Sequence, residues 1–216
     1  MSSELATLLD RGLIWKTGNI RETPADSGHS TGFYNLDAIL PDRGWPSGQV
    51  VELLTEHSFV GEMSLVLPTM ARLEKTAHIA WVDPPCMPYA VAMQQWGLNL
   101  PNNLWIESGE PANGTWTVEQ LSASGHFRIV LFWPQAISYP HTRRLQLAAG
   151  KGNCLVFLFR PMTEQQQNSG ASLRLGMQYV KALSETERRL EMRILKGRQG
   201  SIQRQTLLDL PGYPGI

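Results

Sequence analysis

The chain has 216 residues and no net charge, because its 19 Lys and Arg residues balance its 19 Asp and Glu residues. This length suits a single domain, and the neutral total gives no overall field that would attract nucleic acid. Cys86 and Cys154 have no spacing typical of a metal site or a disulfide framework, and no apolar run approaches the ~18 residues of a membrane span. We therefore expect a cytoplasmic protein that uses no membrane, metal or cofactor.

Residues 1–28 predict a short helix followed by a linker. Leucines recur at helical spacing between residues 4 and 16, and a segment rich in turn-forming residues, 23–29, then interrupts the pattern. This region precedes the core, to which we assign residues 29–200. Residues 201–216 are interpreted as a C-terminal tail.

The segment from Thr55 to Ser64 has the setting of a phosphate-binding loop without the residues that bind phosphate. Such a loop follows a strand, uses several glycines and ends in Lys-Ser/Thr. Here Gly61 is the only glycine, Glu62 stands where the lysine should be, and Ser64 lies one residue too far along. At ~4 Å and an effective dielectric of ~20, a charge pair is worth about 4 kcal/mol, so an anion in place of the cation repels phosphate. We predict a strand-to-helix turn that binds no nucleotide.

Apolar runs and helical patterns alternate through the core. This alternation predicts an α/β fold, with a mostly parallel central sheet and helices on both of its faces. Strands are expected at Val50–Leu54, His78–Val82, Leu104–Ile106, Phe127–Trp133 and Cys154–Phe159, and helices at Glu62–Glu74, Pro88–Trp96, Thr117–Ser124 and His141–Ala149.

Beyond Arg160 the pattern becomes strand-like without intervening helices. Strands are expected at Ser172–Leu175, Gln178–Leu183 and Leu190–Leu195, which predicts an antiparallel extension of the sheet. The polar segment 162–170, which contains no Lys or Arg, is interpreted first as a flexible connection and second as a DNA contact.

Positive charge and leucines gather near the end of the chain. In a strand through 189–195, alternation places the basic side chains on one face and Leu190, Met192 and Ile194 on the other, toward the core. The basic face either contacts a partner or DNA, or is a solvated sheet edge. The candidate contact residues are Arg188, Arg189, Arg193, Lys196, Arg198, Arg204, Leu207, Leu208 and Leu210.

Several segments in one order resemble the core of RecA-type recombinases. The likeness starts in the leading segment 30–52, with its Ser-Thr-Gly turn and Gly-Trp-Pro turn, and continues through the strand 78–83. It implies a RecA-like core, and a segment before such a core packs on a neighbouring subunit, so self-association is one implied outcome. In this alignment Pro85 occupies the position of the catalytic glutamate and Trp133 that of the metal-orienting aspartate. Proline exchanges no proton and indole does not ligate Mg²⁺, so we expect no ATP hydrolysis.

The combination most closely resembles the ImuA family. The segments that carry this likeness are 65–73, 80–85, 132–136 and 189–196. The resemblance implies a non-catalytic accessory protein of a translesion synthesis mutasome, induced by DNA damage in the SOS response. Its implied partners are an ImuB-type Y-family-like protein and an error-prone C-family polymerase, RecA or DNA.

A second resemblance is to the SOS cell-division inhibitor SulA. The segments 125–133 and 152–161 are as similar to SulA as to ImuA. A SulA-like protein would bind the tubulin-like protein FtsZ instead. The recombinase-like leading segment and the basic segment after residue 185 favour ImuA over this alternative.

Overall fold

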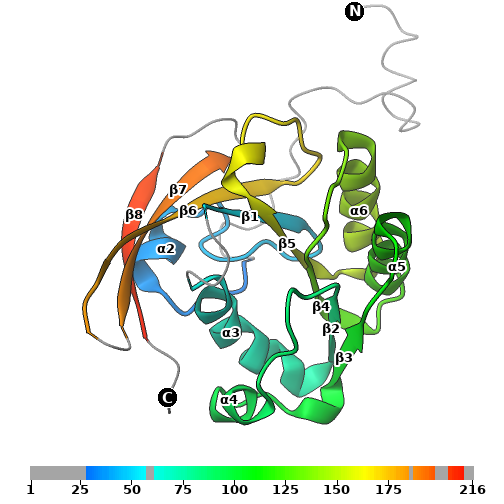
Figure 1. The fold of residues 1–216 in the computed structure, drawn as a ribbon, viewed down its shortest axis with the longest axis horizontal. Coiled ribbons are helices and arrows are strands. Elements are labelled where there is room, and N and C mark those ends of the chain that lie inside the picture. The colour runs from blue at the N-terminus through cyan, green and yellow to red at the C-terminus, as the bar shows by residue number, and fades with distance from the viewer. Residues whose placement is uncertain (1–27, 57–60, 185–186, 198–203, 212–216) are drawn as a thin grey trace, which may run out of the picture.

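The computed structural model describes residues 28–56, 61–184, 187–197 and 204–211, and these form one eight-stranded sheet flanked by helices (Figure 1). The helix predicted within the first 27 residues lies outside the described residues. The strands are β1 (Val50–Thr55), β2 (His78–Val82), β3 (Asn103–Ile106), β4 (Phe127–Phe132), β5 (Leu155–Pro161), β6 (Leu173–Ala182), β7 (Arg188–Lys196) and β8 (Gln205–Leu210). Their order across the sheet is β3-β2-β4-β5-β1-β6-β7-β8.

The sheet is mixed. Strands β3, β2, β4, β5, β1 and β6 run parallel to one another, and β7 and β8 are antiparallel additions at one end. The prediction of a mostly parallel sheet with an antiparallel C-terminal extension is therefore confirmed. The segment interpreted as a C-terminal tail contributes the last strand, β8, which pairs with β7.

Helices cover both faces of this sheet, as predicted. They are α2 (Tyr34–Ile39), α3 (Glu62–Leu73), α4 (Ala90–Gln95), α5 (Pro111–Ala123) and α6 (Tyr139–Gly152), with single 3-10 turns at Glu74–Thr76, Leu100–Asn102 and Met162–Glu164. Two apolar clusters separate the layers. One contains Leu36, Leu65 and Met93 from α2, α3 and α4, and the other contains Val118 and Leu145 from α5 and α6. Figure 1 shows α5 and α6 side by side, away from α2 and α3.

Strand β1 lies in the middle of the sheet, between β5 and β6, and both of its faces are buried. The apolar run in its sequence, interrupted only by Glu52, suits this position, because a strand covered on both sides needs no polar face. Each fully buried valine or leucine contributes about 1.5–3 kcal/mol relative to exposure. The strand therefore positions the loop that follows it firmly.

Two predicted boundaries were wrong. Helix α5 begins at Pro111 and not at Thr117, since a proline in the first turn lacks only an N–H that would have no partner there. The two strands predicted at 172–175 and 178–183 are the single strand β6, because Gly176 continues the ladder between β1 and β7.

The described residues include no helix long and apolar enough to cross a membrane.

Candidate functional site

The turn between β1 and α3 is closed by its own carboxylate. Glu62 is buried at the first position of α3, and its Oε2 accepts a hydrogen bond from the Gly61 N–H at 3.1 Å. The first N–H groups of a helix have no intrahelical partner and attract anions. Glu62 therefore supplies from within the chain the negative charge that a bound phosphate would supply in a working loop. Residues 57–60 of this turn lie outside the described part of the chain.

The other two residues predicted at this turn differ in burial. Ser64 is buried inside α3, and Thr55 is half-buried at the end of β1. The space above Gly61 is also filled, because a Cβ placed on Gly61 would meet Leu210 Cδ1 at 2.9 Å and Leu190 Cδ1 at 3.5 Å. Gly61 has φ +124°, which disfavours a side chain for a second reason. Gly61 is thus packed against side chains of β7 and β8.

An aromatic row occupies the carboxyl ends of the parallel strands. The Trp133 ring stacks on Phe159 with centroids 4.4 Å apart, and lies nearly parallel to Trp81 at 6.1 Å. Trp81 in turn packs against Trp105 at 4.4 Å. Ligands of open parallel sheets bind outside the carboxyl ends of the strands. Here Trp133 stands in that region with an apolar ring where a magnesium site would need oxygen.

The carboxylate of Asp83 is hydrogen-bonded within the protein. Its two carboxylate oxygens accept hydrogen bonds from the backbone N–H and the hydroxyl of Ser108, both at 2.7 Å. A Cβ on Gly114 would lie 2.5 Å from Asp83 Oδ2, so this carboxylate also packs closely on α5. Pro85 follows two residues later and is exposed. The described residues contain no group of three His, Cys, Asp or Glu side chains that could hold a metal.

A buried ion cluster joins β1, β5 and β6, and the sequence analysis missed it. Glu52 of β1 is fully buried and accepts from Arg160 of β5 at 3.0 Å and from Arg174 of β6 at 2.6 Å. The hydroxyl of Ser169 donates to the same carboxylate. A carboxylate within an apolar run and an arginine within another were the available signals. Such a cluster holds the three central strands in one register.

The same cluster fastens the polar segment 162–170, which was interpreted as a flexible connection. Arg160 donates to Glu164 at 2.6 Å and to the Gln167 side chain at 3.0 Å, and Arg174 donates to the Gln165 carbonyl at 3.1 Å. That interpretation was wrong for a physical reason. Two buried guanidinium groups have more donors than Glu52 can accept, and the segment supplies the remaining acceptors.

The predicted basic face carries carboxylates as well as arginines. Arg189 of β7 forms a bidentate pair with Asp209 of β8, at 2.6 and 2.7 Å, and Arg193 pairs with Glu191 at 2.7 Å. The Asp209 carboxylate raises the pKa of Arg189, and Arg189 lowers the pKa of Asp209. Leu190, Met192 and Ile194 are buried as predicted. The face is therefore less positive than the sequence suggested.

The remaining candidate contact residues are spread over different environments. Lys196 donates to the Ser169 carbonyl at 2.7 Å, and burial together with Arg174 lowers its pKa. Arg204 is exposed and donates to the Ile39 carbonyl at 3.4 Å. Arg188 is half-buried, with its Cδ 3.5 Å from a Cβ built on Gly61, and Arg198 lies outside the described residues.

The three leucines of β8 have two different roles. Leu208 and Leu210 are buried in the core, so they cannot make the external contact proposed for them, whereas Leu207 is 48% exposed. Period-two alternation in a strand explains the division. Leu207 borders a groove of about 470 Å³ between the start of α2 and β8. The groove is lined by Gly32, Phe33, Tyr34, Asn35, Arg189, Leu207, Leu208 and Asp209.

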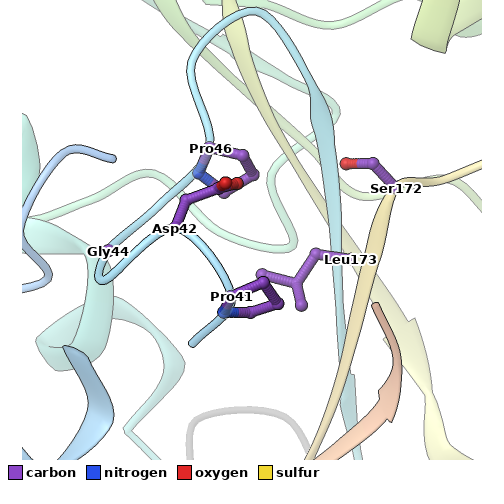
Figure 2. A pocket seen from close by; sticks show the side chains of 6 residues that line it. All are labelled: Pro41, Asp42, Gly44, Pro46, Ser172 and Leu173. Carbon is purple, nitrogen blue, oxygen red and sulfur yellow. The ribbon is translucent and has the colours of Figure 1, made fainter. Parts of the chain in front are cut away.

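Hydrogen bonds hold the turn of the leading segment in place and attach it to α3. Asp37 accepts hydrogen bonds from the Ser30 hydroxyl at 2.6 Å and the Thr31 N–H at 2.8 Å. Thr69 of α3 donates to the Ser30 carbonyl at 3.0 Å. The Gly-Trp-Pro turn that follows borders a second hollow, shown in Figure 2 between that turn and the start of β6. Its volume of about 10 Å³ holds no more than about one water molecule.

Exposed apolar side chains occur just before α4 and in its first turn. Met87 is 69% exposed, Tyr89 is 70% exposed and Val91 is 46% exposed. Single exposed apolar residues are normal, but three of them within five positions of the sequence make a candidate protein contact. We refer to Met87, Tyr89 and Val91 as the α4 patch.

Comparison with known proteins identifies relatives over part of the chain. No family model matches it. It is 26% identical over 125 residues to the cell division inhibitor SulA of Yersinia enterocolitica, a match that covers 57% of this chain and 74% of that protein. It is 34% identical over 116 residues to the cell division inhibitor SulA of Photorhabdus laumondii, covering 51% of this chain and 63% of that protein. The chain is related to SulA.

A solved structure also matches in part. The crystal structure of SulA from Pseudomonas aeruginosa is 18% identical, with a TM-score of 0.44, and the match covers 51% of this chain and 97% of that one. The relation to SulA was predicted as the less favoured of two resemblances. The narrower assignment to ImuA stays a prediction.

Proposed function

We propose that this chain is an SOS-response protein of the SulA type, which acts in the cytoplasm by binding FtsZ and inhibiting cell division. The observation that carries the proposal is the sequence likeness to two proteins named as cell division inhibitors. It reverses the preference of the sequence analysis, which placed the mutasome accessory first. FtsZ itself is the partner that the SulA resemblance implies.

The proposed activity needs no nucleotide chemistry. Glu62 neutralises the start of α3, Trp133 fills the carboxyl ends of the strands with an apolar ring, and Pro85 has no proton to exchange. These features support a non-catalytic protein with a RecA-like core. Purified protein incubated with Mg²⁺ and ATP is expected to release no phosphate above the rate without protein, and sustained turnover would refute this part of the proposal.

The α4 patch is the surface that we assign to the partner. Its three residues are apolar, exposed and close together in the sequence, and α4 packs on the face of the sheet away from α5 and α6. A partner that covers Met87 and Tyr89 would bury apolar surface, which favours binding by about 25 cal/mol for each Å². The costs of association reduce this gain.

The decisive experiment is a polymerisation assay with purified FtsZ and GTP. Added protein is expected to reduce both sedimented polymer and GTP turnover, and its overproduction is expected to cause filamentation of cells. The double variant Met87→Ser/Tyr89→Ser should lose inhibition, whereas Trp116→Ser is the matched control, because Trp116 is 60% exposed on the opposite face. Full polymerisation at saturating wild-type protein would refute the proposal.

The second candidate is the accessory protein of a translesion mutasome, with an ImuB-type partner. Two observations favour it: the SulA matches leave a large part of this chain unmatched, and the recombinase-like leading segment is an ordered unit docked on α3. Co-purification with an ImuB-type protein, together with unchanged FtsZ polymerisation, would favour this candidate over the first.

A further inference from the structure

The outer edge of β8 has hydrogen-bonding groups with no partner among the described residues. The Ile194 N–H donates to the Arg204 carbonyl at 2.9 Å, which makes residues 194 and 204 a hydrogen-bonded pair of the antiparallel β7–β8 ladder. Such pairs alternate along the ladder. The backbone groups of residues 206, 208 and 210 therefore point toward β7, and those of Gln205, Leu207 and Asp209 point away from it.

This edge also lacks the usual protection. Natural sheets shield edge strands with lysine, proline, bulges or very short length. The opposite edge, β3, has only four residues and follows Pro101 closely. Strand β8 has six residues, contains neither lysine nor proline, and pairs with β7 in an unbroken register. The side chains on its solvent-facing side include Leu207, which is 48% exposed.

The edge is complementary to itself. If two copies pair antiparallel with Leu207 opposite Leu207, then Gln205 of each copy lies opposite Asp209 of the other. All three outward-facing residues then form hydrogen-bonded pairs, with an apolar pair at the centre and an amide beside a carboxylate at each flank. A register centred on Asp209 would place two carboxylates directly opposite each other, which destabilises a strand pair.

We propose that two copies of this chain associate through β8, in the antiparallel register centred on Leu207, and so join their sheets into one continuous sheet. The association goes beyond the proposed function and uses a surface distinct from the α4 patch. Tyr34, which is 86% exposed at the start of α2, borders the groove beside the same edge. The second copy's strand closes that groove and covers part of Leu207.

Cysteine cross-linking tests the register directly. The variants are made in a Cys86→Ser background, because Cys86 is exposed whereas Cys154 is buried, which raises the pKa of its thiol to about 12. In a hydrogen-bonded antiparallel pair the Cα atoms are about 5.5 Å apart, within disulfide range. Leu207→Cys is therefore expected to form a reducible covalent dimer on mild oxidation.

The matched control is Gln205→Cys. In the proposed register two Cys side chains at 205 are offset by four residues, about 13 Å, and should not bond. An equimolar mixture of Gln205→Cys and Asp209→Cys chains should form the mixed dimer. Equal cross-linking of the single Leu207→Cys and Gln205→Cys variants, or none in any variant, would overturn the proposal.

Sedimentation equilibrium gives an independent readout. Wild-type protein is expected to reach the mass of a dimer at high concentration, whereas Leu207→Glu, which places like charges opposite each other, should raise the dissociation constant at least about tenfold. Leu207→Val should keep the dimer, because it retains an apolar residue suited to a strand. A wild-type mass that stays monomeric throughout would overturn the proposal, since residues of the same chain would then cover the edge.

Discussion

The parallel and the antiparallel ends of the sheet differ in the surfaces that they leave open. The parallel strands β3, β2, β4, β5 and β1 have the arrangement in which α/β proteins bind ligands, and beyond them Glu62 accepts the Gly61 N–H while the Trp133 ring stacks on Phe159. The antiparallel strands β7 and β8 have no such crevice, yet they carry an open edge and a groove. The two ends of one sheet thus differ: side chains of the protein itself pack at one end, while the other end leaves a strand edge and a groove for contact.

The largest expected effect comes from the ion cluster that joins the two ends. Replacing Glu52 by Gln leaves Arg160 and Arg174 buried without their shared carboxylate, and breaking a buried pair in this way costs about 3–5 kcal/mol. Urea denaturation followed by circular dichroism measures the loss. The same change at the exposed Glu187 should cost less than about 0.5 kcal/mol. Equal losses would show that the cluster does not support the fold.

The next effect separates the two faces of β8. Leu208→Ala removes a buried side chain and should cost about 2–5 kcal/mol, whereas Leu207→Ala should change stability by less than about 0.5 kcal/mol. Both variants are compared by denaturation at a concentration low enough that association does not contribute. A large loss in Leu207→Ala alone would mean that the inner and outer faces are reversed.

A smaller effect is expected from replacing the Trp133 ring at the carboxyl ends of the parallel strands. Trp133→Asp restores a carboxylate at the position expected for metal binding, but it breaks the stack on Phe159 and should cost about 2 kcal/mol, because Trp133 is only half-buried. No ATPase activity should appear, since Glu62 and Pro85 are unchanged. Phosphate release by this variant, measured beside Trp116→Asp as the control, would contradict our account of the crevice.

The smallest effect is a pH dependence of the leading segment. Burial, with Arg128 and Arg72 nearby, lowers the pKa of His29 below its ordinary value of 6.5. The folded state therefore binds the proton less readily than the unfolded state, and the stability present above pH 6.5 falls as the pH drops below that value. His29→Gln should flatten this part of the stability curve while preserving a partner for the Ser47 hydroxyl. An unchanged slope would contradict the assignment to His29.

Local sequence signals were sufficient for most of the fold. The largely apolar run at 50–54 and the alternation at 189–195 predicted β1 and the inward face of β7, because the periodicity of a strand is a property of neighbouring residues. The start of α5 was missed, although Pro111 is a recognised signal for a first helical turn. The two strands expected at 172–175 and 178–183 are one strand, and pairing with β1 and β7 keeps Gly176 within it.

Long-range partners could not be predicted in the same way. Glu52 meets Arg160 and Arg174 only after three strands have come together, and nothing near Glu52 in the sequence identifies those partners. The basic face was overestimated for the same reason, because Asp209 reaches Arg189 from the next strand. The loop residues Gly61 and Glu62 were predicted from a known motif, but the packing of Leu210 over Gly61 was not.

The packing of Leu210 against Gly61 opposes the creation of a nucleotide site at this turn. A lysine introduced at position 62 would place a cation in a buried position beside the N-terminus of α3, while Leu210 would still cover the glycine. Removing Leu210 first would open a cavity in the core before any ligand could bind. Each single change toward a nucleotide site would therefore pass through a less stable protein.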